Sequence, residues 1–259
     1  MVSAPLVRRS AIPTYLVENT SEPVDAGSRD TVGGWAVLPA GESWPVCFCG
    51  ARMVLFFQLD VPADVPAFGG DHLLVFQCPV HTDPVIPEGV DERLPERFWD
   101  RPPIAEPGPF WRILLHRDDT GPTDEPEPYL RAGRLDLVRG TEELTIWRAE
   151  QKLTDGQVVD GQATDEAFAE HGTGVRQFKV GGVPSWIQEP ESYRCACGTE
   201  LVHLCQVAEN TGFARQPGQP EQTYAADPDE YLLFLGNELY VLACPAHCHP
   251  AAAWPVLHN

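Results

Sequence analysis

One spacing of glycines and cysteines occurs twice in this chain and restricts how it folds. Gly33-Gly34 is followed by Cys-Phe-Cys-Gly at 47–50. Gly181-Gly182 is followed, at the same spacing, by Cys-Ala-Cys-Gly at 195–198. The two copies are 148 residues apart. Such self-similarity at a fixed offset predicts a duplicated structural unit.

Each copy also ends in the same way. A glutamine, Gln58 or Gln206, stands nine residues after the second cysteine of its copy. A Cys-Pro-x-His segment then closes each copy, at 78–81 and at 244–247, with an offset of 166 residues. Because 166 less 148 leaves 18, the second copy holds 18 additional residues, which we expect to form a loop between about Glu209 and Pro228.

Three cysteines and one histidine per copy match a standard ligand set for structural zinc. The ligands come as two local pairs, Cys-x-Cys and Cys-Pro-x-His, and the glycine after each Cys-x-Cys permits a tight turn toward an ion. The sequence therefore predicts two structural Zn²⁺ ions. Their ligands would be Cys47, Cys49, Cys78 and His81 in the first copy and Cys195, Cys197, Cys244 and His247 in the second.

The residues leave alternatives to this assignment open. The cysteines would be unliganded core residues, redox partners such as Cys47 with Cys78, or ligands of iron or another ion. Ligands exchanged between the copies are a further alternative. In the second copy, Cys248 and His249 directly follow the Cys-Pro-x-His segment, and either would replace His247 as a ligand.

Charge and composition restrict the class of partner. The chain carries 38 acidic and 18 basic residues, for a net charge of −20. Phosphate backbones would be repelled, so we expect no nucleic-acid partner, whereas a basic protein would be attracted. No apolar run approaches the roughly 18 residues of a membrane span, and prolines interrupt any secretory signal near the N-terminus. We expect a cytoplasmic monomer without a membrane contact, in which reduced thiols bind metal.

Patterns of apolar residues predict the secondary structure. The runs at 53–61, 110–116 and 239–243 have the length and composition of strands, and 135–138 with 144–147 reads as a short strand pair. Glycine turns at Gly70-Asp71 and Gly236-Asn237 predict hairpins. Thr164–Gly172 predicts a short helix that Thr164 caps and Gly172 ends.

These elements predict a β-rich α+β fold of two duplicated, mainly antiparallel sheet units related by pseudo-twofold symmetry. Four segments follow along the chain. They are an N-terminal arm (1–31), the first repeat unit (32–84), a proline-rich connector with short strands (85–160) and the second repeat unit (161–259).

The same residues resemble the YwqG-like family, a bacterial domain family of unknown function. The resemblance lies in Trp44-Pro45, the run 53–60, Leu73–Phe76 and the segment Val180–Gln188. The Val-Gly-Gly-x-Pro-x-Trp run at 180–186 is more distantly similar to programmed cell death protein 2. The first resemblance implies a duplicated β-rich fold without an assigned reaction. The second implies a chaperone-like role toward a basic ribosomal protein.

Two functions of different classes follow. The first is a non-enzymatic, protein-binding or chaperone-like module, since four protein ligands close a zinc site to substrate and no nucleophile-elbow or phosphate-loop motif occurs. The alternative is an enzyme or small-molecule-binding protein that uses a cleft between the halves near Trp35, Trp44 and Trp186. A stress or toxin-immunity role is a third hypothesis.

Overall fold

The computed structural model describes residues 6–20, 22–82, 93–103, 109–148, 169–172, 174–223 and 225–259. Strands dominate this part of the chain, and its helical content is a single four-residue 3₁₀ turn, η1. The predicted α+β class is therefore replaced by an almost purely β structure among the described residues. The elements are β1 (Leu6–Asn19), β2 (Thr31–Val32), β3 (Val54–Asp60), β4 (His72–Gln77), β5 (Trp111–His116), β6 (Gly133–Arg148), β7 (Ala169–Gly172), β8 (Lys179–Gly181), β9 (Val202–Val207), β10 (Gly212–Ala214), β11 (Glu230–Leu232), η1 (Leu233–Gly236), β12 (Glu238–Ala243) and β13 (Ala253–His258).

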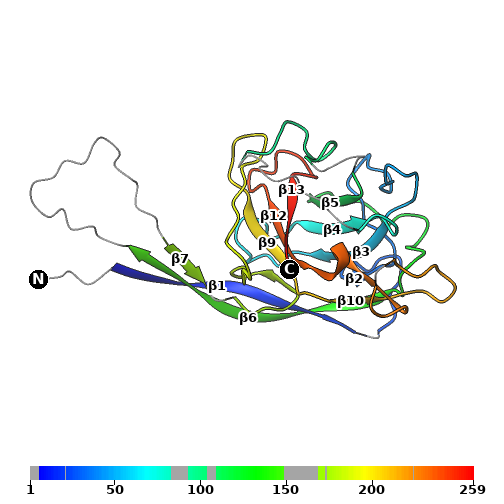
Figure 1. The fold of residues 1–259 in the computed structure, drawn as a ribbon, viewed down its shortest axis with the longest axis horizontal. Helices are drawn as coiled ribbons and strands as arrows, with labels where there is room; N and C mark the ends of the chain where they lie inside the picture. Colours follow the sequence, from blue (N-terminus) through cyan, green and yellow to red (C-terminus); the bar gives the residue numbers. More distant parts are fainter. Residues whose placement is uncertain are drawn as a thin grey trace, which may run out of the picture.

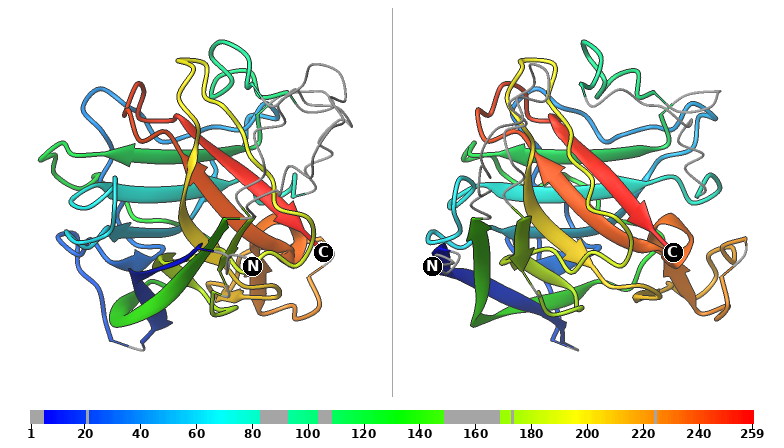
Figure 2. Two further views of the ribbon diagram at one scale, coloured as in Figure 1. Left: turned by 90° about the vertical axis from the view of Figure 1, so that its left-hand side faces the viewer. Right: turned by 60° about the vertical axis from the view of Figure 1, so that its left-hand side comes forward.

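One large antiparallel sheet contains most of these strands. Its order is β13-β12-β9-β8-β1-β6-β2-β3-β4-β5, with β7 added to β6, and β10 and β11 form a separate pair. The order is arranged about β1 and β6: β2 to β5 lie on one side, and β8, β9, β12 and β13 on the other. Figures 1 and 2 show the two sets as walls whose strands cross at an angle. At the far ends, the Leu115 N–H donates to the Pro250 carbonyl at 2.7 Å, so the sheet nearly closes.

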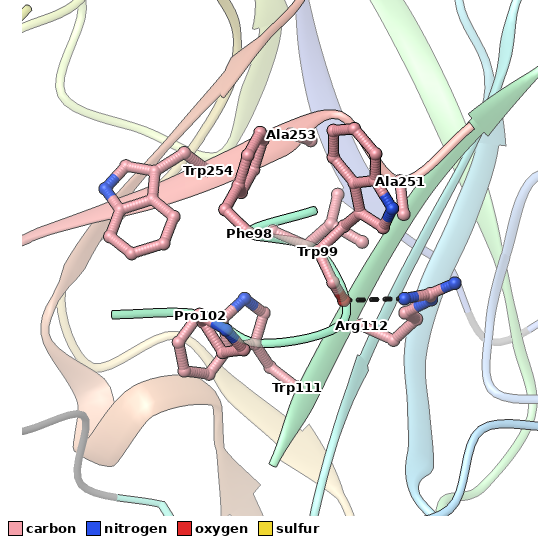
Figure 3. A pocket seen from close by; sticks show the side chains of 9 residues that line it. Phe98, Trp99, Pro102, Trp111, Arg112, Ala251, Ala253 and Trp254 are labelled. Carbon is pink, nitrogen blue, oxygen red and sulfur yellow. Dashed lines mark hydrogen bonds between the residues drawn. The ribbon is translucent and has the colours of Figure 1, made fainter. Parts of the chain in front are cut away.

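Aromatic side chains fill the seam where β5 meets β13. Phe98 and Trp99 lie against Trp111 of β5 and Trp254 of β13 (Figure 3). The ring centroids of Trp111 and Trp254 are 6.0 Å apart, and Arg112 donates to the Trp99 carbonyl at 2.7 Å. The space left between these side chains is about 10 Å³, room for about one water molecule. The seam is thus packed core and no ligand site.

The strand predicted at 53–61 is confirmed as β3. Its side chains from Val54 to Leu59 are all buried, which explains the continuous apolar run in place of an alternating pattern. Phe56 packs edge-to-face against Phe213 at 5.2 Å, while its neighbour Phe57 packs against Phe178 at 4.9 Å. The unbroken burial from Val54 to Leu59 means that both faces of β3 contribute to the core.

The proline-rich connector contributes more to the sheet than its composition indicates. Its strand at 110–116 is confirmed as β5, but the two short strands predicted at 135–138 and 144–147 are one continuous strand, β6. β6 pairs with β1 over fourteen residues, from Leu6 opposite Arg148 to Asn19 opposite Leu135. The pair projects from the body of the molecule together with β7 (Figure 1).

Three other local predictions were wrong in part. Within the predicted helix Thr164–Gly172, residues 169–172 form β7, and 164–168 lie outside the described residues. The predicted hairpins also differ: an eleven-residue segment joins β3 to β4, and β12 pairs with β9 and β13, not with the segment before Gly236. The additional residues of the second copy include β10, which pairs with β11.

The glycine pairs make the same turn in both copies. Gly33, Gly34, Gly181 and Gly182 all have positive φ, from +57° to +79°. At Gly182 a Cβ atom would lie 2.4 Å from a Glu142 carboxylate oxygen, so only glycine fits there. The two repeated glutamines hold the segments that follow the glycine turns. Gln58 accepts the Val37 N–H at 2.9 Å, and Gln206 accepts the Ser185 N–H at 3.0 Å, which explains why both copies carry glutamine.

A buried ion pair anchors the second glycine turn. The Lys179 ammonium lies 2.8 Å from Oε1 and 3.0 Å from Oε2 of Glu142, and it also donates to the Val183 carbonyl at 2.6 Å. Glu142 further accepts the N–H groups of Val175 and Val183. Burial lowers the pKa of Lys179, and the hydrogen bond that Lys179 donates to Glu142 acts in the opposite direction. Both charged groups thus have hydrogen-bond partners, and the ion pair joins β6, which contains Glu142, to β8, which contains Lys179.

Replacing Lys179 by methionine leaves the Glu142 carboxylate buried without a counter-charge. We expect Lys179→Met to lower the free energy of unfolding by about 3–5 kcal/mol. The control is Arg139→Met, which removes the solvent-exposed pair with Asp64 and should leave the free energy of unfolding nearly unchanged. Urea unfolding followed by tryptophan fluorescence measures both. Equal losses for the two variants would contradict the role given to the buried pair.

Candidate metal centres

The first predicted ligand set converges in the structure. Cys47, Cys49, Cys78 and His81 each offer one ligand atom, and these four atoms all lie within 4.8 Å of one another. Nδ1 of His81 is 3.7 Å from the Cys47 sulfur and 3.5 Å from the Cys78 sulfur, and the Cys49 and Cys78 sulfurs are 3.9 Å apart. The histidine therefore faces the thiols through Nδ1.

A second cluster of the same size lies in the second copy. It consists of Cys195, Cys197, Cys244 and Cys248, whose sulfurs also lie within 4.8 Å of one another. The Cys195–Cys248 distance is 3.4 Å, Cys197–Cys244 is 3.6 Å and Cys244–Cys248 is 3.7 Å. Seven of the eight predicted ligands thus lie in the two clusters, and Cys248 takes the eighth place.

His247 is the predicted ligand that the structure places elsewhere. Its Nε2 lies 2.8 Å from a carboxylate oxygen of Asp71, a fully buried residue that also accepts from Arg117. Its backbone is left-handed, with φ of +48°, so the chain turns at this residue and Cys248 joins the other sulfurs. The structure therefore places Cys248, the alternative that the adjacent residues left open, in the cluster in place of His247.

Each Cys-x-Cys-Gly turn presents its two thiols by the same hydrogen bonds. In the first turn, Cys47 N–H donates to the Ala51 carbonyl and Gly50 N–H donates to the Cys47 carbonyl, both at 2.8 Å. The second turn repeats both bonds at the same length. Gly50 and Gly198 have φ of +86° and +92°, a conformation that glycine adopts without strain. The glycine after each cysteine pair is thus required by the turn.

The spacing of the ligand atoms suits a tetrahedral zinc ion. Zinc–sulfur bonds of about 2.3 Å in a tetrahedron place the sulfurs about 3.8 Å apart. The sulfur–sulfur distances given above for the two clusters are 3.4 to 3.9 Å. Disulfide bonds need about 2.05 Å, so all of these thiols are free. Three thiols with one imidazole, and four thiols, are both standard sets for structural zinc.

The thiols of each cluster differ in pKa, because some are buried and others accept hydrogen bonds. Burial raises the pKa of Cys47 well above its ordinary value and that of Cys195 to about 11. For the exposed Cys49, burial opposes ionisation, but backbone and thiol hydrogen bonds lower its pKa overall. Hydrogen bonds from the hydroxyl and backbone of Thr199 lower the pKa of Cys197 to about 6. A cation would therefore meet one thiol of lowered pKa in each cluster, and its binding would displace the protons of the thiols whose pKa burial raises.

The three tryptophans named for the alternative function line three separate clefts. Trp186 lines a cleft of about 380 Å³, Trp35 one of about 340 Å³ and Trp44 one of about 280 Å³. Only the first brings residues of the first repeat unit, such as Val65, against the second glycine turn. The geometry of a cleft between the halves is therefore present at Trp186.

Metal content of two variants separates the roles of Cys248 and His247. We expect the wild-type protein to hold two zinc ions per chain, Cys248→Ser to retain one, and His247→Ala to retain both. A hydroxyl is a poor replacement for a thiolate ligand, whereas the His247 imidazole lies against the Asp71 carboxylate and outside the cluster. Elemental analysis of proteins purified at neutral pH measures the content. Loss of metal from His247→Ala with full retention in Cys248→Ser would reverse the assignment.

Known proteins give no functional assignment for this chain. No model of a known protein family matches the chain, and no curated protein matches it. The resemblance to the YwqG-like family therefore stays a prediction.

Proposed function

We propose that this protein is a non-enzymatic, protein-binding module whose two halves each hold a structural zinc ion. The observation that carries the proposal is the pair of complete four-ligand clusters. Four protein ligands leave no open position for a substrate, which is the property that separates structural from catalytic zinc. Zinc is the ion we propose because thiolate-rich tetrahedral sites favour it.

Each zinc ion would hold together the same two segments of its duplicated unit. Support for the duplication comes from the strand order, in which β2, β3, β4 and β5 correspond to β8, β9, β12 and β13 across the β1–β6 pair. In each set the Cys-x-Cys turn precedes the second strand, and the remaining ligands follow the third. We propose a pseudo-twofold relation between the sets on this basis. Each ion would then tie the start of one strand to the end of its neighbour.

A partner surface is supported by apolar side chains beside the first cluster. Val46, Phe48 and Val80, which we name the apolar patch, are 57%, 37% and 61% exposed. Each is a chain neighbour of a ligand, and the Phe48 ring lies 4.4 Å from that of His81. Exposed apolar groups that gather at one place favour a protein contact. With a net charge of −20, the partner we propose is a basic protein.

The proposed compartment is a reducing one, the cytoplasm, because free thiols are the ligands. Among the described residues, no helix has the length and apolar character that crossing a lipid bilayer requires. We propose that the protein acts as a monomer that binds its partner.

Removal of zinc is the direct test of the structural role. Because ligand binding energy of about 10–16 kcal/mol per structural zinc is coupled to folding, we expect chelation at neutral pH to unfold or aggregate the protein. Circular dichroism and light scattering before and after chelation, with re-addition of zinc as the control, measure this. Fewer than one zinc per chain in the purified protein, or an unchanged spectrum after its removal, would reject the structural role.

The protein-binding role is tested by affinity capture from the native cytosol, with metal content measured on the same sample. We expect a saturable, basic partner whose capture falls at least several-fold in the Phe48→Ser, Val80→Ser double variant, because side chains at the centre of an interface carry most of its affinity. The matched control is Val138→Ser with Val175→Ser, whose valines are 44% and 46% exposed elsewhere. No saturable partner, or equal losses in both double variants, would count against the role.

A second function is supported by the cleft at Trp186. Its volume of about 380 Å³ lies within the range of small-molecule sites, and it contains His203, whose pKa burial lowers to about 3. A small-molecule-binding function would use this cleft, with or without a reaction. The closed metal clusters favour the protein-binding function over catalysis.

A further inference from the structure

The cleft at Trp186 has a lining that selects a particular ligand chemistry. It lies between β1, the segment that joins β3 to β4, the second glycine turn and the start of β9. Its lining residues are Ile12, Val65, Pro66, Gly181, Gly182, Val183, Pro184, Trp186, Glu191, Ser192, Glu200, Leu201, Val202, His203 and Leu242. The cleft thus has apolar walls, one indole and a small number of polar groups.

The formal charge of this lining is entirely negative. Glu191 and Glu200 are its charged residues, and no lysine or arginine stands among the described residues that line it. Glu191 accepts one hydrogen bond from the Tyr193 hydroxyl at 2.5 Å and lies 3.2 Å from Nε2 of His258. Among the described residues, no ion pair joins a lysine or an arginine to Glu191 or Glu200. An anionic ligand would meet two carboxylates without a counter-charge. A cation is the complementary ligand.

Trp186 gives this cleft an aromatic surface held in a fixed position. Its ring centroid lies 4.2 Å from that of Tyr240 and 5.3 Å from that of His258. The Tyr240 hydroxyl donates to the Ser185 carbonyl at 2.8 Å, so the residues around the indole are themselves held. Tryptophan is the aromatic residue that attracts cations most strongly.

His203 is a polar group in this lining whose hydrogen bonds are unmade. Neither ring nitrogen has a partner among the described residues, although both are buried. Burial, and secondarily the charge of Lys179, lower the pKa of His203, so the imidazole is neutral at physiological pH. A neutral imidazole has one lone pair that accepts a hydrogen bond. The nearby Lys179 ammonium is paired with Glu142 and adds little net charge.

The other two clefts already contain their own cations. In the Trp44 cleft, the Arg52 guanidinium lies 3.8 Å from the centroid of the indole. Arg112 contacts both acids there, Glu42 at 3.5 Å and Asp100 at 3.6 Å. The Trp35 cleft is lined by Arg131. Acids and indole without an internal cation therefore distinguish the Trp186 cleft.

We propose that the Trp186 cleft binds the side chain of an arginine or lysine that a protein partner inserts into it. The apolar walls suit the methylene stem of such a side chain, while the indole and the two carboxylates suit its charged head. This inference rests on the proposed function, because it locates charge recognition of a basic partner. It also assigns the cleft a protein side chain in place of a free small molecule.

The test uses fluorescein-labelled peptides of alternating glycine and arginine, glycine and lysine, or glycine and glutamine, with the zinc-loaded full chain. We expect the two basic peptides to bind and the glutamine peptide to fail. Trp186→Leu should weaken binding about tenfold, the loss of a desolvated cation–π contact. Glu200→Lys should weaken it at least as much, and Glu200→Gln less. Trp35→Leu and Glu221→Lys are the matched controls, with unchanged affinity.

A site-specific measurement keeps the test independent of folding. The indole N–H resonance of Trp186 is identified as the one that is missing from the spectrum of Trp186→Leu. Binding of a basic peptide should shift this resonance more than that of Trp35. Unchanged affinity in Glu200→Lys, or a shift confined to Trp35, overturns the proposal. Equal affinity for arginine amide and for the arginine peptide would overturn it in favour of a small-molecule site.

Failure of this inference differs from failure of the proposed function. A basic partner that is captured normally by the Trp186→Leu and Glu200→Lys variants, but lost from the apolar-patch variant, removes the cleft proposal alone. Absence of any basic partner in the capture experiment removes both.

Discussion

The antiparallel pairing of β1 with β6 is the contact on which the rest of the structure depends. These strands pair over fourteen residues in the middle of the strand order, and one set of four strands continues from each of them. The Lys179–Glu142 pair joins β6 to β8 across β1, so the second set is attached by an ion pair as well as by backbone hydrogen bonds. At the opposite edge, aromatic packing between β5 and β13 nearly closes the sheet.

Within this frame, the four-ligand clusters lie where strands end and turns begin. Each Cys-x-Cys turn buries its first cysteine, Cys47 or Cys195, in the core and leaves its second, Cys49 or Cys197, exposed. The exposed end of each turn is held by backbone hydrogen bonds, and a bound ion would add to them. A bound ion would stabilise these turns, as the burial of apolar side chains stabilises β3. His247 also links distant parts of the chain, because it is the chain neighbour of Cys248 in the second cluster and contacts Asp71 just before β4.

Local patterns of apolar residues and glycines identified strands that are buried on both faces. They failed where the same pattern is compatible with two different strand pairings. The run 53–61 specified β3 because its apolar residues have one way to be covered. The glycine turns at Gly70 and Gly236 indicated hairpins, but pairing depends on which strand lies opposite, and β12 finds β9 instead. The break between 138 and 144 hid one long strand, because β1 supplies backbone partners throughout it. Of the charges there, Arg139 is exposed and Glu142 is buried against Lys179, so neither ends the strand.

The sequence by itself determined seven of the eight cluster residues, since a repeated order of ligand types at constant spacing has few physical explanations other than a shared site. It also determined the glycine turns and the glutamines that support them. Only the tertiary structure decided between His247 and Cys248, because that choice depends on the left-handed turn at His247 and on the Asp71 carboxylate, which comes from 176 residues away. The cleft at Trp186 was likewise decided by packing, since its walls come from segments that are distant in the chain.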